Sequence, residues 1–125
     1  MGYSSVGVGI NATLQTTFQY YLPVVQSQGA NTTTKFVSIT IPLSNVSKIG
    51  YYFKITTVGA GTHTCEIDVD GTTEVSENRT AVAGTSEFDG YIDVTGYTGN
   101  VILEANQITV GDNGKISDFS LWMVS

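Results

Sequence analysis

The chain has 125 residues, of which 41% are hydrophobic and 13% charged, and its formal net charge is −6. This length fits one domain with a core that needs no disulfide, and the acidic balance argues against sequence-independent binding to nucleic acid. The 14 valines and 10 isoleucines against 5 leucines and 6 alanines exclude an all-helical protein, and no apolar run reaches the roughly 18 residues of a membrane-spanning helix.

Residues 1–13 are rich in glycine and serine, and they carry Val6, Val8 and Ile10 in alternation with glycine. Such alternation is typical of a strand, yet the glycines weaken a strand that stands alone. We therefore expect residues 1–13 to form an extended arm that packs against another chain or subunit. Residues 14–125 are expected to form a single β-sandwich domain.

From residue 14 onward, apolar and polar residues alternate in short runs, which predicts strands rather than helices. Pro23 ends the first strand or confines it to a sheet edge. The polar residues 26–34 are predicted as a loop, and residues 43–50 as a connection that could include a short turn of helix. The predicted strands of this half are residues 14–22, 35–41 and 51–56.

The second half has shorter strand signals separated by glycine-rich turns. Asp70-Gly71 is a two-residue hairpin signature between residues 65–70 and 72–75, and Gly90 predicts a bulge. The other predicted strands are residues 80–83, 88–94, 101–105, 107–110 and 115–124. About nine or ten short strands in all predict an antiparallel β-sandwich, jelly-roll-like, with an extended N-terminal arm or strand.

The phase of each alternation predicts which side chains are buried. Trp122 is out of phase with its apolar neighbours, so its side chain should point away from the core. Tyr51 and Tyr52 should point to opposite faces, and one of them, with Tyr91 or Tyr97, could stack on a sugar ring. The residues expected to be mainly buried are Val37, Ile39, Ile41, Phe53, Ile55, Ile67, Val69, Ile92, Val94, Leu103, Phe119 and Leu121.

No catalytic constellation stands out in the sequence. Cys65 is the only cysteine and reads as a buried strand thiol, although His63 lies on the same side of that strand and leaves a Cys–His nucleophile to be considered. One histidine and one cysteine do not make a zinc site. Asp112, Asn113 and Asp118 offer oxygen ligands for calcium, but their spacing matches no EF-hand loop and a tight turn explains the first two. We expect neither enzymatic activity nor a cofactor.

The charges are divided along the chain. Residues 1–65 contain three lysines and no acidic residue, whereas residues 66–125 hold all 11 acidic residues with Arg79 and Lys115. This division predicts either two surfaces with different roles or a sandwich whose later strands face water.

The run from Gly114 to Leu121, a glycine turn followed by Asp118 and alternating apolar residues, resembles the last strand of carbohydrate-binding-module jelly rolls. The short, acidic, threonine- and glycine-rich chain is equally similar to the cement or decoration proteins on the capsids of tailed phages and other viruses. The second resemblance implies a protein of the virion surface that binds the major capsid protein and its own copies, for instance as a trimer.

We therefore expect a virion structural protein, with a carbohydrate-binding module or host-adhesion domain as the alternative. The opening residues show no secretory signal, which favours the virion over an extracellular location. The partner contacts that we expect are Val6, Val8, Ile10, Tyr51, Tyr52 and Trp122, and a polysaccharide is the other ligand considered.

Overall fold

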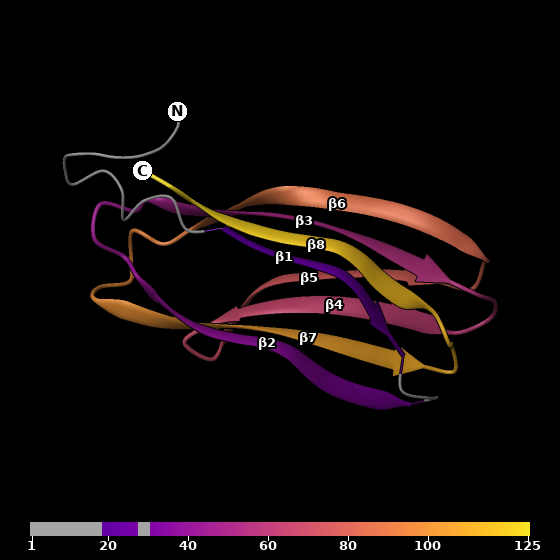
Figure 1. Cartoon of the computed structure of the whole chain (residues 1–125). Helices are drawn as coiled ribbons and strands as arrows, with labels where there is room; N and C mark the ends of the chain where they lie inside the picture. The colour runs from indigo at the N-terminus through magenta and orange to yellow at the C-terminus, as the bar shows by residue number, and fades with distance from the viewer. Residues whose placement is uncertain (1–18, 28–30) are drawn as a thin grey trace.

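The computed structural model describes residues 19–27 and 31–125 (Figure 1). These residues form strands alone, without a helix, and none of them belongs to an apolar helix of membrane-spanning length. The strands in chain order are β1 (Gln19–Gln26), β2 (Thr32–Pro42), β3 (Lys48–Thr57), β4 (Thr62–Val69), β5 (Thr72–Thr80), β6 (Gly84–Asp93), β7 (Asn100–Val110) and β8 (Lys115–Val124).

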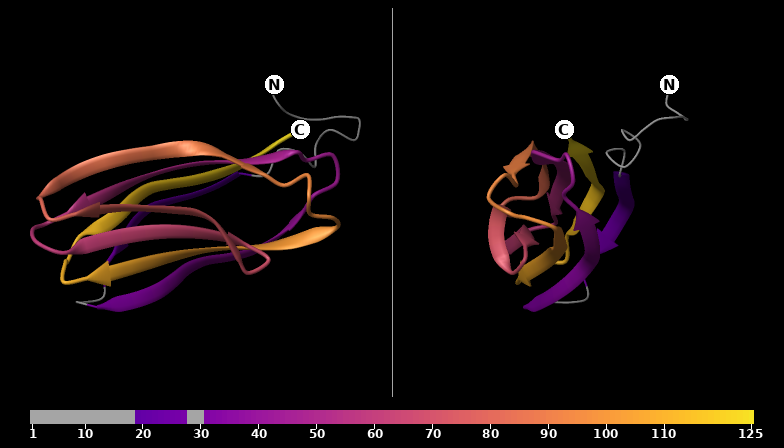
Figure 2. Two further views of the ribbon diagram at one scale, coloured as in Figure 1. Left: turned by 180° about the vertical axis from the view of Figure 1, so that it is seen from behind. Right: turned by 90° about the vertical axis from the view of Figure 1, so that its left-hand side faces the viewer.

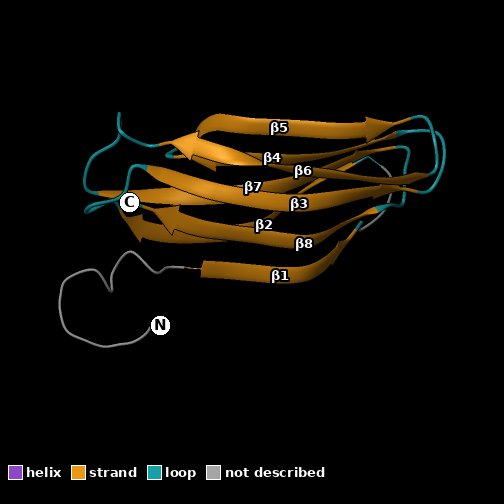
Figure 3. Cartoon of the chain, turned by 90° about the horizontal axis from the view of Figure 1, so that it is seen from above, coloured by secondary structure: helices purple, strands orange, loops and turns teal. Residues whose placement is uncertain are grey.

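The strands form two four-stranded antiparallel sheets that lie face to face (Figure 2). One sheet has the order β1-β8-β3-β6 and the other β2-β7-β4-β5. Seen from above, the connections gather at the two ends of the sandwich (Figure 3). The predicted all-β sandwich is confirmed.

The core lies between the two sheets and is centred on Phe119. Its ring lies 5.0 Å from Phe36, 6.1 Å from Phe53 and 6.5 Å from Tyr20, measured between centroids. Every residue expected to be buried is buried except Ile39, which is partly exposed because β2 is the edge strand of its sheet.

Four local features differ from the predictions. Residues 81–83 are a turn and not part of a strand, because β5 continues as the partner of β4 up to Thr80. Gly90 makes no bulge; it faces the Tyr51 ring, and a Cβ at this position would lie 2.7 Å from the Tyr51 hydroxyl. Residues 100–110 form one strand and not two, because Asn106, which separates the two predicted strands, stays in register with Lys35 on β2 and Glu66 on β4. The connection at residues 43–47 contains no helical turn.

The charge division along the sequence does not separate the two sheets. Strands from the first half pair with strands from the second half in both sheets, so lysines meet acidic residues across the strands. Lys35 on β2 contacts Glu104 on β7 at 2.7 Å, and Lys54 on β3 contacts Asp118 on β8 at 3.3 Å. The division of charge along the sequence therefore does not correspond to the division of the sandwich into two sheets.

Candidate functional site

Four aromatic side chains gather on the outer side of the β1-β8-β3-β6 sheet. They are Tyr21, Tyr52, Tyr91 and Trp122, one from each strand, and we call this surface the aromatic face. Tyr21 is 59% and Tyr91 61% exposed, which is unusual for side chains of this size. Each belongs to the outward phase of its strand, since its neighbours in sequence point into the core.

Trp122 lies over β3 because a glycine leaves room for it. Gly50 is the register partner of Trp122, and a Cβ at Gly50 would overlap the indole ring. On the far side of β3, Tyr91 meets the indole edge-on, with the centroids 6.4 Å apart and the ring planes at 84°. The Lys48 ammonium lies 5.5 Å from the centre of the Tyr91 ring, within cation–π range. These contacts hold a large, partly exposed aromatic surface in one orientation.

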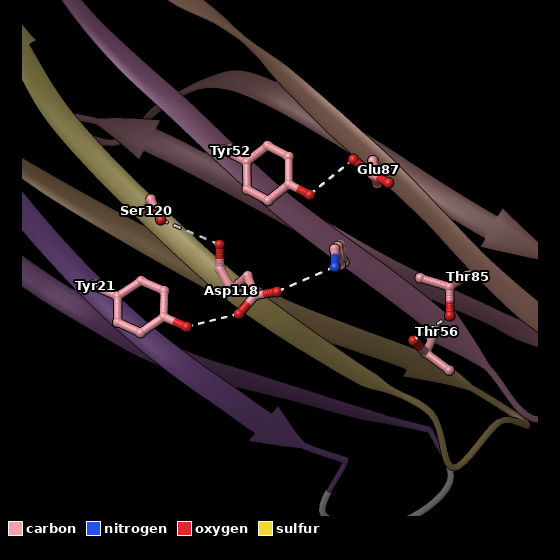
Figure 4. A network of polar contacts seen from close by, with 8 residues as sticks. Tyr21, Tyr52, Thr56, Thr85, Glu87, Asp118 and Ser120 are labelled. Carbon is pink, nitrogen blue, oxygen red and sulfur yellow. Dashed lines mark hydrogen bonds and ion pairs between the residues drawn. The ribbon is translucent and has the colours of Figure 1, made fainter.

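A polar network crosses the same face next to the rings (Figure 4). The Tyr21 hydroxyl donates to Asp118 Oδ1 at 2.7 Å, and Lys54 Nζ lies 3.3 Å from Asp118 Oδ2. The Tyr52 hydroxyl donates to Glu87 Oε1 at 2.9 Å. The hydrogen bond from Tyr21, followed by the one from Lys54, lowers the pKa of Asp118. Asp118 is therefore ionised at neutral pH and orients both partners.

The backbone turns the Asp118 side chain toward this network. Asp118 has a φ of 50°, and the register between β3 and β8 shifts beside it, between Tyr52 and Lys54. Opposite this irregularity, Pro23 on β1 has no register partner on β8. Pro23 thus lies within an edge strand, one of the two positions that the sequence allowed for it.

A shallow depression lies at the start of β1 beside the indole. Its volume is about 290 Å³, and it is lined by Gln19, Tyr20, Tyr21, Ser120, Leu121 and Trp122. The outward side chains among these, an amide, one phenol and a serine hydroxyl, lie beside the aromatic ring, so the surface can bind a ligand both by stacking and by hydrogen bonds.

The predicted contact residues fall into three groups. Tyr52 and Trp122 lie on the aromatic face. Tyr51 points inward, as expected for the neighbour of Tyr52, and stacks on Phe53 with centroids 5.9 Å apart. Val6, Val8 and Ile10 lie outside the described residues. Sequence reasoning did not select Tyr21, although the inward phase of Tyr20 and Leu22 marks it as an outward side chain.

The polar residues inside the sandwich do not form a reactive centre. Cys65 is buried, and its burial raises the pKa of the thiol, so it carries no thiolate at neutral pH. The interpretation of Cys65 as a buried strand thiol is confirmed. The Asp112 carboxylate accepts the backbone N–H groups of Val58 and Gly59 at 3.1 Å. Asp112 and Asp118 are thus both held by protein donors, and no group of three metal-binding side chains occurs in residues 19–27 and 31–125.

No model of a known protein family and no curated protein matches the sequence. Solved structures do match the fold. A chain in the structure of the Gx strain of infectious bursal disease virus aligns over 84% of this chain with a TM-score of 0.56 and 18% identity. The VP2 subviral particle of the same virus aligns over 84% with a TM-score of 0.51 and 16% identity. The CBM36-1 domain of a multidomain xylanase from the hindgut metagenome of Trinervitermes trinervoides aligns over 88% of this chain and 90% of its own length, with a TM-score of 0.48 and 14% identity.

What the chain shares with the viral chains is the fold. The present chain corresponds to 31% of the length of each of the two viral chains. It therefore shares one sandwich domain with proteins that are several times longer.

Proposed function

We propose that this chain is a virion structural protein, a cement or decoration protein that binds capsid subunits and its own copies at the particle surface. The observation that carries the proposal is the aromatic face, whose rings are exposed and held in a fixed orientation. This surface lies on a sandwich whose fold is similar to that of the viral chains. Aromatic side chains are enriched at protein interfaces, where their large area contributes strongly to binding.

The contact would be made by the outer side of the β1-β8-β3-β6 sheet. Trp122 and Tyr91 supply the apolar centre, and the Tyr21–Asp118–Lys54 group supplies hydrogen bonds around it. Residues 1–13 would provide a second contact with a neighbouring subunit. Several weak contacts on many copies give a high overall avidity even where each one is small.

Non-enzymatic action is part of the proposal. The two residues considered as a nucleophilic pair, His63 and Cys65, are fully buried on an inward strand face. On the aromatic face, Lys54 is paired with Asp118 and Glu87 accepts a hydrogen bond from Tyr52, as in structural contacts.

Sedimentation velocity over a wide range of concentrations tests the proposal. We expect a concentration-dependent oligomer that the double substitution Tyr91→Ala and Trp122→Ala shifts toward the monomer. The matched control is Ile102→Ala, because Ile102 is also exposed, at 49%, but belongs to β7 of the other sheet. A monomer at all concentrations that also fails to bind capsids of its own virus would refute the proposal.

Binding of a carbohydrate by the same face is the second candidate. The observation that favours it is the depression in which the Trp122 indole is bordered by Gln19, Tyr21 and Ser120. Sugar rings stack on flat aromatic surfaces and bind such polar groups through their hydroxyls. Pull-down with a panel of insoluble polysaccharides separates the two candidates: retention that Trp122→Ala abolishes supports carbohydrate binding, and no retention rejects it.

A further inference from the structure

Three exposed valines occur at the same end of the sandwich, where β3, β5 and β7 finish. Val58 and Val82 are each 62% exposed and Val110 is 55% exposed. They belong to the connection 58–61, the connection 81–83 and the last residue of β7. We call these three residues the valine tip. It lies opposite the end at which β1 begins and β8 finishes (Figure 1).

The segments that carry the valines are held against one another. The Thr57 hydroxyl donates to the Val82 carbonyl at 2.5 Å, and the Ala81 N–H donates to the Gly61 carbonyl at 2.9 Å. Gly61 is packed so closely against Gly111 that a Cβ on Gly61 would lie 2.5 Å from the Gly111 backbone. The valine tip is therefore a fixed surface and not three independent loops.

The loops of this end present almost no charge. The connections 58–61, 81–83 and 111–114 contain one charged residue, Asp112, which is 4% exposed and bonded to backbone N–H groups. The nearby Arg79 guanidinium is turned toward Thr57 and Ser86, at 2.9 and 2.7 Å. The opposite end carries exposed Asp70 and Asp93. An uncharged ligand can thus approach the valine tip without desolvating an ion.

We propose that the valine tip of one copy binds residues 6–10 of a neighbouring copy. This inference rests on the proposed function, which requires contacts between copies. Residues 1–18 contain no Asp, Glu, Lys or Arg, and Val6, Val8 and Ile10 recur at every second position. A strand with small apolar side chains on one face matches a surface made of valine, alanine and glycine.

The size of the valine tip favours a short segment over a folded partner. Three partly exposed valines offer far less than the roughly 800 Å² per partner that a stable interface between folded proteins buries. A single extended segment needs only a few side-chain contacts and can add main-chain hydrogen bonds to exposed backbone.

The position of β1 favours a neighbouring copy as the donor. The first described strand begins at Gln19, whose register partner is Trp122 near the end of β8, so residue 19 lies at the end of the sandwich remote from the valine tip of the same copy. To reach that tip the arm would have to run back along the whole sandwich. A copy placed end to end receives it directly, and such a head-to-tail contact propagates as a ring or a filament.

Disulfide trapping in the full-length chain tests the contact. The double variant Val8→Cys with Val82→Cys should give covalent dimers and higher oligomers on a non-reducing gel after mild oxidation, while the buried Cys65 stays unreactive. The control pairs Val8→Cys with Ile102→Cys, which is similarly exposed but lies on β7 away from the valine tip. Cross-links inside one copy, or equal cross-linking in the control, would overturn the inference.

A second variant removes the dependence on cysteine geometry. Val82→Asp places a charge in the valine tip and should weaken self-association about tenfold or more, because the carboxylate would be buried without a partner. Ile102→Asp should leave self-association unchanged, and both variants should keep the melting temperature of the parent. If the wild-type chain assembles and Val82→Asp assembles equally well, the valine tip is not the contact and the proposed function still stands. A wild-type chain that never assembles refutes both.

Discussion

His63 is fully buried, yet only one of its ring nitrogens has a hydrogen-bond partner among the described residues. Its Nε2 lies 2.9 Å from Gln107 Nε2, and that same amide nitrogen donates to the Val25 carbonyl at 2.8 Å. Since an amide nitrogen can only donate, we assign His63 Nε2 as an acceptor and place the ring proton on Nδ1. Burial lowers the pKa of His63 below its ordinary value of 6.5, and the charge of Asp112 opposes that shift only in part. The fold therefore requires a neutral imidazole.

Acidification should destabilise the protein through this histidine. The unfolded chain binds a proton near pH 6.5, whereas the folded chain does so only at lower pH, so the free energy of unfolding is highest above pH 6.5. The free energy of unfolding should fall as the pH is lowered from 6.5 through the pKa of His63 in the folded chain. Below that pKa, His63 should cause no further change. Urea titrations between pH 7.5 and about 5.5, above the range where carboxylates dominate, measure the slope. His63→Gln should flatten it; an equal slope in that variant would contradict the assignment.

Phe119 should carry a large share of the core energy. Its side chain is fully buried between the two sheets and contacts three other aromatic rings. Phe119→Ala should lower the free energy of unfolding by roughly 3–5 kcal/mol, since it leaves a cavity that neighbouring rings cannot fill. Phe119→Leu, which fills most of that space, should cost considerably less. Chemical denaturation of both variants gives the comparison, and a cost below about 1 kcal/mol for the alanine variant would place Phe119 outside the core.

At the scale of elements, Asp112 joins the β7–β8 connection to the β3–β4 connection. Its carboxylate receives the N–H groups of Val58 and Gly59, which would otherwise lose their acceptor. The residue beside it, Gly114, has to be a glycine, because a Cβ at this position would collide with the Thr56 carbonyl. This one side chain thus fixes the path of two connections, each of which crosses from one sheet to the other.

Replacing Asp112 by alanine should destabilise this end of the sandwich. Two backbone donors lose their acceptor, so we expect a cost of roughly 1–3 kcal/mol in the free energy of unfolding. Asp112→Asn keeps an oxygen acceptor and should cost less. Hydrogen exchange of the Val58 and Gly59 amides locates the effect: faster exchange at these two positions is expected, and unchanged exchange would show that the carboxylate is dispensable.

The strands show where sequence reasoning succeeds and where it fails. The inward phase of β2, β3, β4 and β8 follows from alternating Val, Ile and Phe, because burial between two sheets imposes a period of two. The prediction divided β7 at Asn106, which stays paired with Lys35 and Glu66 on the neighbouring strands. The buried position of Gln107 was not predictable, since its partners Val25 and His63 come from other strands. Gly90 and Gly50 likewise make room for Tyr51 and Trp122 across the sheet. The outward phase of Trp122 was predictable, but its contact with Tyr91 depends on the order β8-β3-β6, which local patterns do not contain.

For the whole molecule, the aromatic face gives the most direct prediction. Trp122→Ala should weaken self-association or capsid binding by roughly 2 kcal/mol or more, as expected for an aromatic residue that anchors an interface. The fold should survive, because the indole lies on the outer side of the sheet. Sedimentation velocity and a thermal melt are the two measurements. An unchanged oligomer with a strongly lowered melting temperature would assign Trp122 to the core.

Gly50→Ala provides a variant in which the indole is kept but displaced. The added methyl group overlaps the ring, so the indole must rise from β3 and lose its edge-on contact with Tyr91. Self-association should weaken as in Trp122→Ala, and the tryptophan emission should shift to longer wavelength as the ring becomes more hydrated. An unshifted emission would mean that the indole does not rest on Gly50.

The strand order also determines when the chain can fold. Among the described strands, β1 pairs only with β8 and β2 pairs only with β7, so β1 and β2 wait for strands that are made much later. During synthesis, β3 can pair with β6 and β4 with β5, but the β2-β7-β4-β5 sheet is complete only when β7 has been made, and the β1-β8-β3-β6 sheet only when β8 has been made. Contacts between such distant parts of a chain slow folding and leave apolar strands exposed in the meantime. A ribosome that stalls within β7 would therefore hold a chain in which β1 and β2 have no complete partner strand. Its exposed apolar strands would be prone to aggregate until β8 is made.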